Sequence, residues 1–296
     1  MDAGAEPLAF LKRRAKDLPE RVRPPLTGRW TTVGGLRVFS RVCELAAEAA
    51  TPIIHVHGFA ISGRYLEPTA IRLADRYPTY IPDLPGHGYS EKPRHPLGIP
   101  ELAESLAGYL DCVGVPRAVV LGNSTGCLVA AEFAHRFPER TERAILVSPA
   151  GGRHNRPLAR GVLQLARDGL REPSSLATIA IPDYVRYGLF NSLRAFSGMT
   201  RYPTMERLSH VPVPFLTIIG SRDPLVSEQQ MTKLLQSPAE THLMCHFDAA
   251  HAINFSHPEA LARIVDGYLR GESLRELSET NGVIGYIDSP TEDERV

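Results

Sequence analysis

A serine between two glycines is the residue of this chain best suited to nucleophilic chemistry. Ser124 lies within a G-x-S-x-G pattern at residues 122–126, after a β-branched run and before an Ala- and Leu-rich helical pattern. A strand that turns sharply into a helix at such a serine presents the hydroxyl at the turn, where glycines avoid crowding by Cβ atoms. A serine in a glycine-rich turn can also be only a turn former, but this context predicts that Ser124 is a nucleophile.

A serine hydroxyl is a weak nucleophile at neutral pH and needs a base that accepts its proton. His251 follows the last predicted strand of the core and is the candidate base, because an imidazole titrates near neutral pH. Asp223 follows the strand before that one and is the candidate acid that orients the imidazole. Asp248 is a rival acid, but a neighbour on the same loop is poorly placed to bond the ring of His251.

Short apolar runs alternate with helical patterns along most of the chain. The predicted strands are 30–33, 36–42, 52–56, 79–81, 118–121, 144–147, 213–219 and 242–247, and the predicted helices lie near 64–75, 100–113, 125–136, 227–236 and 258–270. The first two strands form a hairpin on Gly34-Gly35. An opening hairpin followed by this alternation predicts an α/β fold with a mostly parallel eight-stranded sheet flanked by helices.

The alternation stops over residues 151–211. This segment is helix-like and contains nine Arg against four Asp and Glu, and it is too long for a bare loop in a compact domain. We therefore predict an inserted helical cap at 151–211, on a core formed by 26–150 and 212–271. Residues 1–25 are an N-terminal extension, and 272–296 form a polar C-terminal tail that we expect to dock weakly.

The candidate residues all follow predicted strands, at the sheet edge where open α/β sheets bind their ligands. With the elbow pattern and the chain order Ser124, Asp223, His251, the sequence resembles the α/β-hydrolase superfamily, and in particular its cap-bearing esterase-like and C–C-hydrolase-like members. The resemblance covers roughly residues 28–271. It implies a catalytic triad of these three residues, with an oxyanion hole formed by the backbone N–H groups of Phe59 and Thr125.

Three functions fit this pattern. The leading one is a carboxylesterase-like serine hydrolase that cleaves an ester or thioester of a small organic substrate through an acyl-Ser124 intermediate. The alternative is a C–C bond hydrolase of vinylogous diketones of the meta-cleavage type, because Gly122-Asn123-Ser124 is similar to those enzymes. A non-catalytic ligand receptor on the same fold is the third. An arginine-rich cap hints at an anionic substrate, but it is equally typical of a solvated surface.

The composition limits the other possibilities. The formal net charge is zero, which gives no electrostatic footprint for nucleic acid or an anionic membrane, and we find no apolar run long enough for a membrane span. His55 and His57 are two residues apart without a third ligand nearby, so neither a metal nor a cofactor is expected. We expect a cytoplasmic enzyme, monomeric or homodimeric, that acts on a small molecule.

Overall fold

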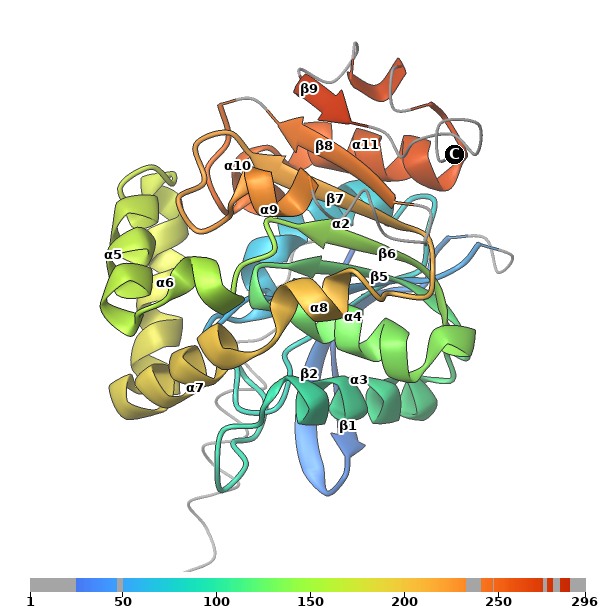
Figure 1. Cartoon of the computed structure of the whole chain (residues 1–296). Coiled ribbons are helices and arrows are strands. Elements are labelled where there is room, and N and C mark those ends of the chain that lie inside the picture. Colours follow the sequence, from blue (N-terminus) through green and yellow to red (C-terminus); the bar gives the residue numbers. More distant parts are fainter. Residues whose placement is uncertain are drawn as a thin grey trace, which may run out of the picture.

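The computed structural model describes residues 25–46, 50–232, 241–246, 248–273, 276–278 and 283–287. The predicted N-terminal extension therefore lies almost entirely outside the described residues. One sheet forms the centre of the molecule, with helices on both faces (Figure 1). No helix among the described residues combines the length and the apolar character needed to cross a bilayer.

The described strands form one nine-stranded sheet in the order β1-β2-β4-β3-β5-β6-β7-β8-β9. They are β1 (Thr27–Val33), β2 (Leu36–Cys43), β3 (Ile53–Val56), β4 (Thr79–Pro82), β5 (Ala118–Asn123), β6 (Thr141–Val147), β7 (Phe215–Gly220), β8 (Thr241–His246) and β9 (Val283–Ile287). Strands β3 to β8 pair in parallel, whereas β1 with β2, β2 with β4 and β8 with β9 are antiparallel.

The expected count of eight strands was one too low. The ninth strand, β9, pairs with the outer edge of β8, inside the segment that we had treated as a polar tail. Its sequence, VIGYI, is rich in the β-branched and aromatic residues that favour strands. The polar composition of the tail as a whole concealed this short run.

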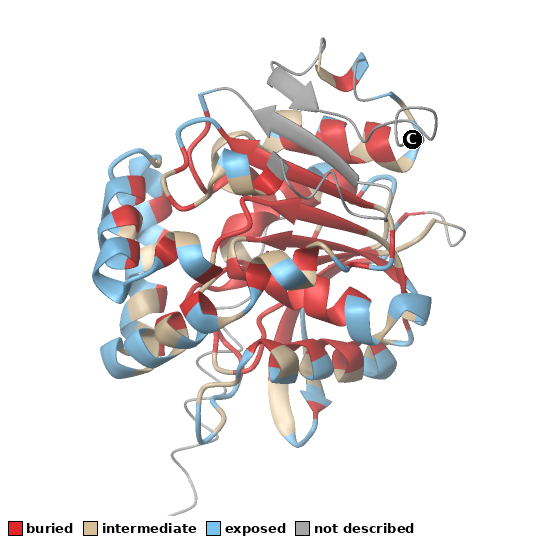
Figure 2. Cartoon of the chain, in the orientation of Figure 1, coloured by how far each residue is buried: buried red, intermediate tan, exposed pale blue. Residues whose placement is uncertain are grey.

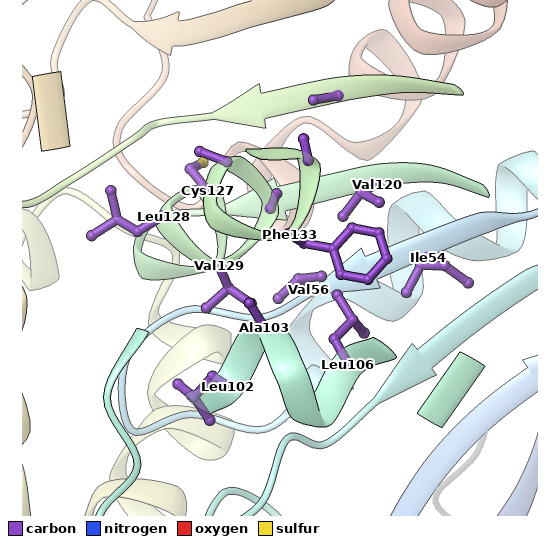
Figure 3. Packing of buried hydrophobic residues seen from close by; sticks show 14 of the residues in the cluster. Ile54, Val56, Leu102, Ala103, Leu106, Val120, Cys127, Leu128, Val129 and Phe133 are labelled. Carbon is purple, nitrogen blue, oxygen red and sulfur yellow. The ribbon is translucent and has the colours of Figure 1, made fainter. Parts of the chain in front are cut away.

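Helices cover both faces of the sheet. Those outside the cap are α2 (Glu67–Leu73), α3 (Ile99–Val113), α4 (Thr125–Arg136), α9 (Glu228–Thr232), α10 (Ile253–Ser256) and α11 (Pro258–Leu269), with single 3₁₀ turns η1 (Gly63–Leu66) and η2 (Pro138–Arg140). Helices α3 and α4 pack on one face, where Leu106 and Phe133 lie against Val120 of β5 (Figure 3). Helix α11 packs on the other face, against Val119 and Leu121. Successive residues of β5 thus point to opposite faces and are buried on both, which explains its unbroken apolar sequence.

The predicted cap segment is helical. It contains η3 (Gly152–Asn155), α5 (Leu158–Gly169), α6 (Ser174–Tyr187), α7 (Leu189–Arg201) and α8 (Thr204–Leu208). Helices α5, α6 and α7 lie together at one side of the molecule, beyond the ends of the strands (Figure 1). We keep the term cap for residues 151–211.

The turn from β5 into α4 leaves no room for side chains at its two glycines. A Cβ added to Gly122 would lie 2.4 Å from the carbonyl oxygen of Gly126, and one added to Gly126 would lie 2.2 Å from the carbonyl oxygen of Val56. Contacts this short with backbone cannot be relieved by a side-chain rotation. The elbow therefore requires glycine at both positions.

The substitution Gly126→Ala tests this close packing, because it forces β3 and α4 apart. Overpacking of this kind costs about 3 kcal/mol, so we expect a loss of that size in the free energy of unfolding measured with urea. Gly169→Ala, at the end of α5, is the control, since an added Cβ there meets nothing within 4 Å. Equal stability of the two variants would contradict the packing argument.

Candidate active site

Two cavities lie between the sheet and the cap. The larger, of about 360 Å³, is lined by Ser124 and His251 from the core and by residues of α5, α6 and α7 from the cap. The smaller, of about 300 Å³, is lined by Thr125 and the loop before α3, and Phe59 borders both cavities. Two of the candidate residues, Ser124 and His251, thus line the same cavity.

Ser124 lies in a strained backbone conformation at the end of β5, with φ of 58° and ψ of −123°. A positive φ is uncommon for residues other than glycine, and such strain concentrates at functional sites. Within the described residues the Ser124 hydroxyl makes no hydrogen bond. It lies at the wall of the larger cavity.

Asp223 and His251 form a hydrogen-bonded pair. The distance between Oδ2 of Asp223 and Nδ1 of His251 is 2.7 Å, and the Asp223 side chain is only 1% exposed. Burial alone would lower the pKa of His251, but the charge and hydrogen bond of Asp223 outweigh it and raise this pKa to about 9. Because Nδ1 is held by the carboxylate, Nε2 is the ring nitrogen left for proton transfer.

The rival carboxylate lies elsewhere. Asp248 is exposed and forms an ion pair with Arg222, with 2.9 Å between its Oδ1 and the arginine Nε. Among the described residues, Asp223 is the carboxylate hydrogen-bonded to the ring of His251.

The two candidate oxyanion donors lie on either side of the elbow. Thr125 is the first residue of α4, where backbone N–H groups have no partner within the helix. The turn that carries Phe59 packs directly against the nucleophile, because a Cβ added to Gly58 would lie 3.1 Å from Cβ of Ser124. The turn at 58–59 and the start of α4 thus both lie beside the serine.

A buried tyrosine that we had not predicted joins these loops. The backbone N–H of Gly58 donates to the Tyr65 hydroxyl at 2.9 Å, and that hydroxyl donates to Oδ1 of Asn123 at 2.6 Å. The Asn123 amide in turn donates to the carbonyls of Val147, at 3.0 Å, and His251, at 3.3 Å. Burial raises the pKa of Tyr65 far above its ordinary value, so the hydroxyl keeps its proton. From the sequence, only the position of Asn123 beside Ser124 could be recognised, and its bond with Tyr65 could not.

Comparisons with known proteins identify the family of this chain. Residues 53–264 match the model of the alpha/beta hydrolase family. The chain belongs to the alpha/beta hydrolase family. A poly(3-hydroxyalkanoate) depolymerase of Ectopseudomonas oleovorans is 28% identical over 250 residues, covering 77% of this chain and 87% of that protein.

Two other similar proteins extend the comparison. An uncharacterized protein of Mycobacterium tuberculosis strain H37Rv is 32% identical over 140 residues, which is 47% of this chain. The match spans only 40% of the length of that protein. The crystal structure of a membrane phospholipase A, described as a bacterial virulence factor, has a TM-score of 0.70 with 23% identity and covers 90% of this chain and 92% of its own. That likeness shows the shared fold.

A buried ion pair fixes the loop after β4 in this α/β hydrolase. One oxygen of Asp83 lies 2.8 Å from Nη1 of Arg41 and accepts the N–H of Gly63 at 2.7 Å, and the other accepts the N–H of Tyr89 at 3.0 Å. Arg41 also pairs with Glu67 at 2.8 Å. The loop at 83–90 is thus a scaffold held by buried polar contacts.

His57 belongs to the same scaffold and is not free to hold a metal. Its Nε2 accepts the N–H of Leu84 at 2.9 Å, so Nδ1 carries the proton and donates to the carbonyl of Gly58 at 2.8 Å. Burial lowers the pKa of His57 and keeps the ring neutral. The described residues contain no group of three or more His, Cys, Asp or Glu that could bind a metal ion.

Exchanging the carboxylate tests the role of Asp223. We expect Asp223→Asn to leave folding intact and to reduce kcat by about 10²–10⁴-fold, because the imidazole loses the partner that orients it and stabilises its charged form. Asp248→Asn is the matched control and should retain normal turnover. Steady-state kinetics on both variants check this expectation, and near-normal activity of Asp223→Asn would contradict it.

Proposed function

We propose that this α/β hydrolase is a serine hydrolase that cleaves a carboxylic ester or thioester of a small organic substrate through an acyl-Ser124 intermediate. The observation that carries the proposal is the hydrogen-bonded Asp223–His251 pair, whose imidazole lines the same cavity as the serine at the elbow. The similar depolymerase supports an ester as substrate, since its name describes a polyester-cleaving enzyme.

In the first half-reaction, Nε2 of His251 accepts the proton of the Ser124 hydroxyl while Oγ attacks the carbonyl carbon. The negative charge that develops on the carbonyl oxygen is stabilised by the backbone N–H groups of Phe59 and Thr125, each worth about 10²–10³ in rate when well aimed. The tetrahedral intermediate collapses as the imidazolium gives its proton to the departing alcohol or thiol. Asp223 stabilises the imidazolium throughout.

In the second half-reaction, water replaces the leaving group. Its proton passes to His251 as its oxygen attacks the acyl carbon, and the same N–H groups hold the second oxyanion. When this intermediate collapses, Oγ of Ser124 takes back the proton and the carboxylic acid is released. The cycle leaves the enzyme unchanged and consumes one water.

The two cavities indicate where the two parts of a substrate bind. The larger is walled mainly by apolar side chains, among them Ile61, Leu165 and Leu176, which suits a hydrocarbon acyl group. The smaller adjoins it at Phe59 and contains Arg194. Within the described part of the chain, Arg194 is the one arginine that lines either cavity, so the arginine content of the cap is no general evidence for an anionic substrate.

The structure weakens one argument for C–C bond cleavage. Asn123 before the nucleophile suggested that chemistry, but its amide is engaged by Tyr65, Val147 and the carbonyl of His251. A scaffolding role accounts for the asparagine without a role toward a vinylogous diketone. We therefore favour ester cleavage.

A substrate series with a serine variant tests the proposal. We expect the protein to hydrolyse p-nitrophenyl esters of short and medium acyl chains, and Ser124→Ala to lose about 10⁴-fold or more of this turnover. A ring-fission dienoate, followed by product analysis, is the competing substrate. Faster cleavage of the dienoate would support the C–C alternative, and ester turnover that survives in Ser124→Ala would exclude acyl-serine chemistry.

The pH profile tests the base. Asp223 raises the pKa of His251 above its ordinary value, and the protonated imidazole cannot act as a base. We therefore expect kcat/KM to rise with pH, with a midpoint above the pKa of a free imidazole, which is about 6.5. Removing the negative charge in Asp223→Asn should move this midpoint to lower pH. Rates of p-nitrophenyl ester hydrolysis measured from about pH 5 to about pH 10 check both expectations, and a flat profile would contradict His251 as base.

A further inference from the structure

Exposed apolar side chains gather on the cap. Among the described residues, nine of the ten large apolar side chains that face solvent belong to it: Leu158, Val162, Leu163, Leu170, Ile181, Val185, Leu189, Phe190 and Leu193; the tenth is Leu45. Single exposed apolar residues are ordinary, but a concentration on one segment marks an interaction surface.

The densest part of this surface is the end of the α6–α7 hairpin. We define the cap tip as Ile181, Val185, Leu189, Phe190 and Leu193, which are 44–79% exposed. The first two are one helical turn apart on α6, and the other three begin α7, directly after Gly188 with its φ of 93°. The turn at this glycine therefore places these five residues on the two arms of one helical hairpin. The outer surfaces of these helices face solvent at the side of the molecule (Figure 2).

The charges of the cap are segregated as well. Of its nine arginines seven are exposed: Arg153, Arg156, Arg160, Arg167, Arg171, Arg194 and Arg201. Of its four acidic residues Asp168 and Asp183 are buried and Glu172 is partly buried, so that only Glu206 is exposed. The outside of the cap is thus apolar and cationic. The zero net charge of the whole chain concealed this segregation.

We propose that the cap tip and the exposed arginines of the cap bind an anionic lipid–water interface. An apolar surface on a cationic segment suits such an interface, where the apolar side chains enter the acyl boundary and the cations meet lipid headgroups. A second copy of the chain is a poorer partner. In a twofold interface the same patch meets itself, and this would set arginines against arginines.

The face of the cap that would contact lipid lies next to both cavities. Ile181 belongs to the cap tip and also lines the larger cavity, and Arg194 of α7 lines the smaller one. An enzyme bound by this face presents its cavities toward the lipid. The binding itself is independent of the proposed function, because it needs no turnover.

Vesicle cosedimentation of the full-length protein tests the proposal. We expect binding to vesicles of phosphatidylcholine with about 30% phosphatidylglycerol, weaker binding to pure phosphatidylcholine, and loss of binding at high salt. Leu189→Ser/Phe190→Ser should bind about tenfold or more weakly. Leu45→Ser is the matched control, because Leu45 is 81% exposed but lies outside the cap, and it should bind like the wild type.

Two further measurements keep the result interpretable. Turnover of a soluble ester and urea unfolding should be unchanged in Leu189→Ser/Phe190→Ser, since neither residue lines a cavity. Arg160→Gln/Arg167→Gln keeps the apolar tip and should weaken binding to the anionic vesicles alone. The proposal is overturned if the wild type does not bind vesicles or if Leu189→Ser/Phe190→Ser binds as well as Leu45→Ser. It is also overturned if light scattering shows that the wild type is a dimer and Leu189→Ser/Phe190→Ser a monomer.

Discussion

The close contact between the start of α4 and the end of β3 is the constraint on which the rest of this site depends. Because Gly126 has no side chain, its backbone rests against the carbonyl groups of Val56 and His57. Helix α4 can therefore begin directly beside the turn at 57–59, with Ser124 held at a positive φ between them. The nucleophile and both candidate oxyanion donors derive their positions from this one contact.

Buried polar groups hold the neighbouring loops against this elbow. Asp83 is fully buried, and although burial alone would raise its pKa, the adjacent Arg41 keeps it below the ordinary value. A buried carboxylate of this kind is stable only when paired and fully hydrogen-bonded, so the loops that supply its partners cannot separate. The Tyr65–Asn123 bonds do the same for the loops of the oxyanion donors and the base. These buried bonds hold the loops around the elbow together.

The sequence predicted what depends on local pattern. Strands β3, β4, β5 and β7 were recognisable because their short apolar runs are buried on both faces of the sheet. Asp223 was preferred to Asp248 because a loop neighbour reaches the ring poorly. Tyr65 could not be found in this way, since its partner Asn123 is 58 residues away and no spacing rule links them. Strand β9 was missed within a polar tail. A count of charges likewise does not tell which arginines of the cap are exposed to solvent.

The cap acts on the base as well as on the substrate. The carboxylate of Asp168 accepts the backbone N–H of His251 at 3.2 Å, and that of Glu172 accepts the N–H of Ala252 at 2.6 Å. Burial raises the pKa of Glu172 to about 7, so near neutral pH this group adds a partial negative charge beside the imidazole. Both carboxylates favour the protonated ring. The inner side of the cap therefore holds the loop of the base and raises the basicity of His251, while the outer side is apolar and cationic. A movement of the cap away from the core would change the position and the basicity of His251 at once.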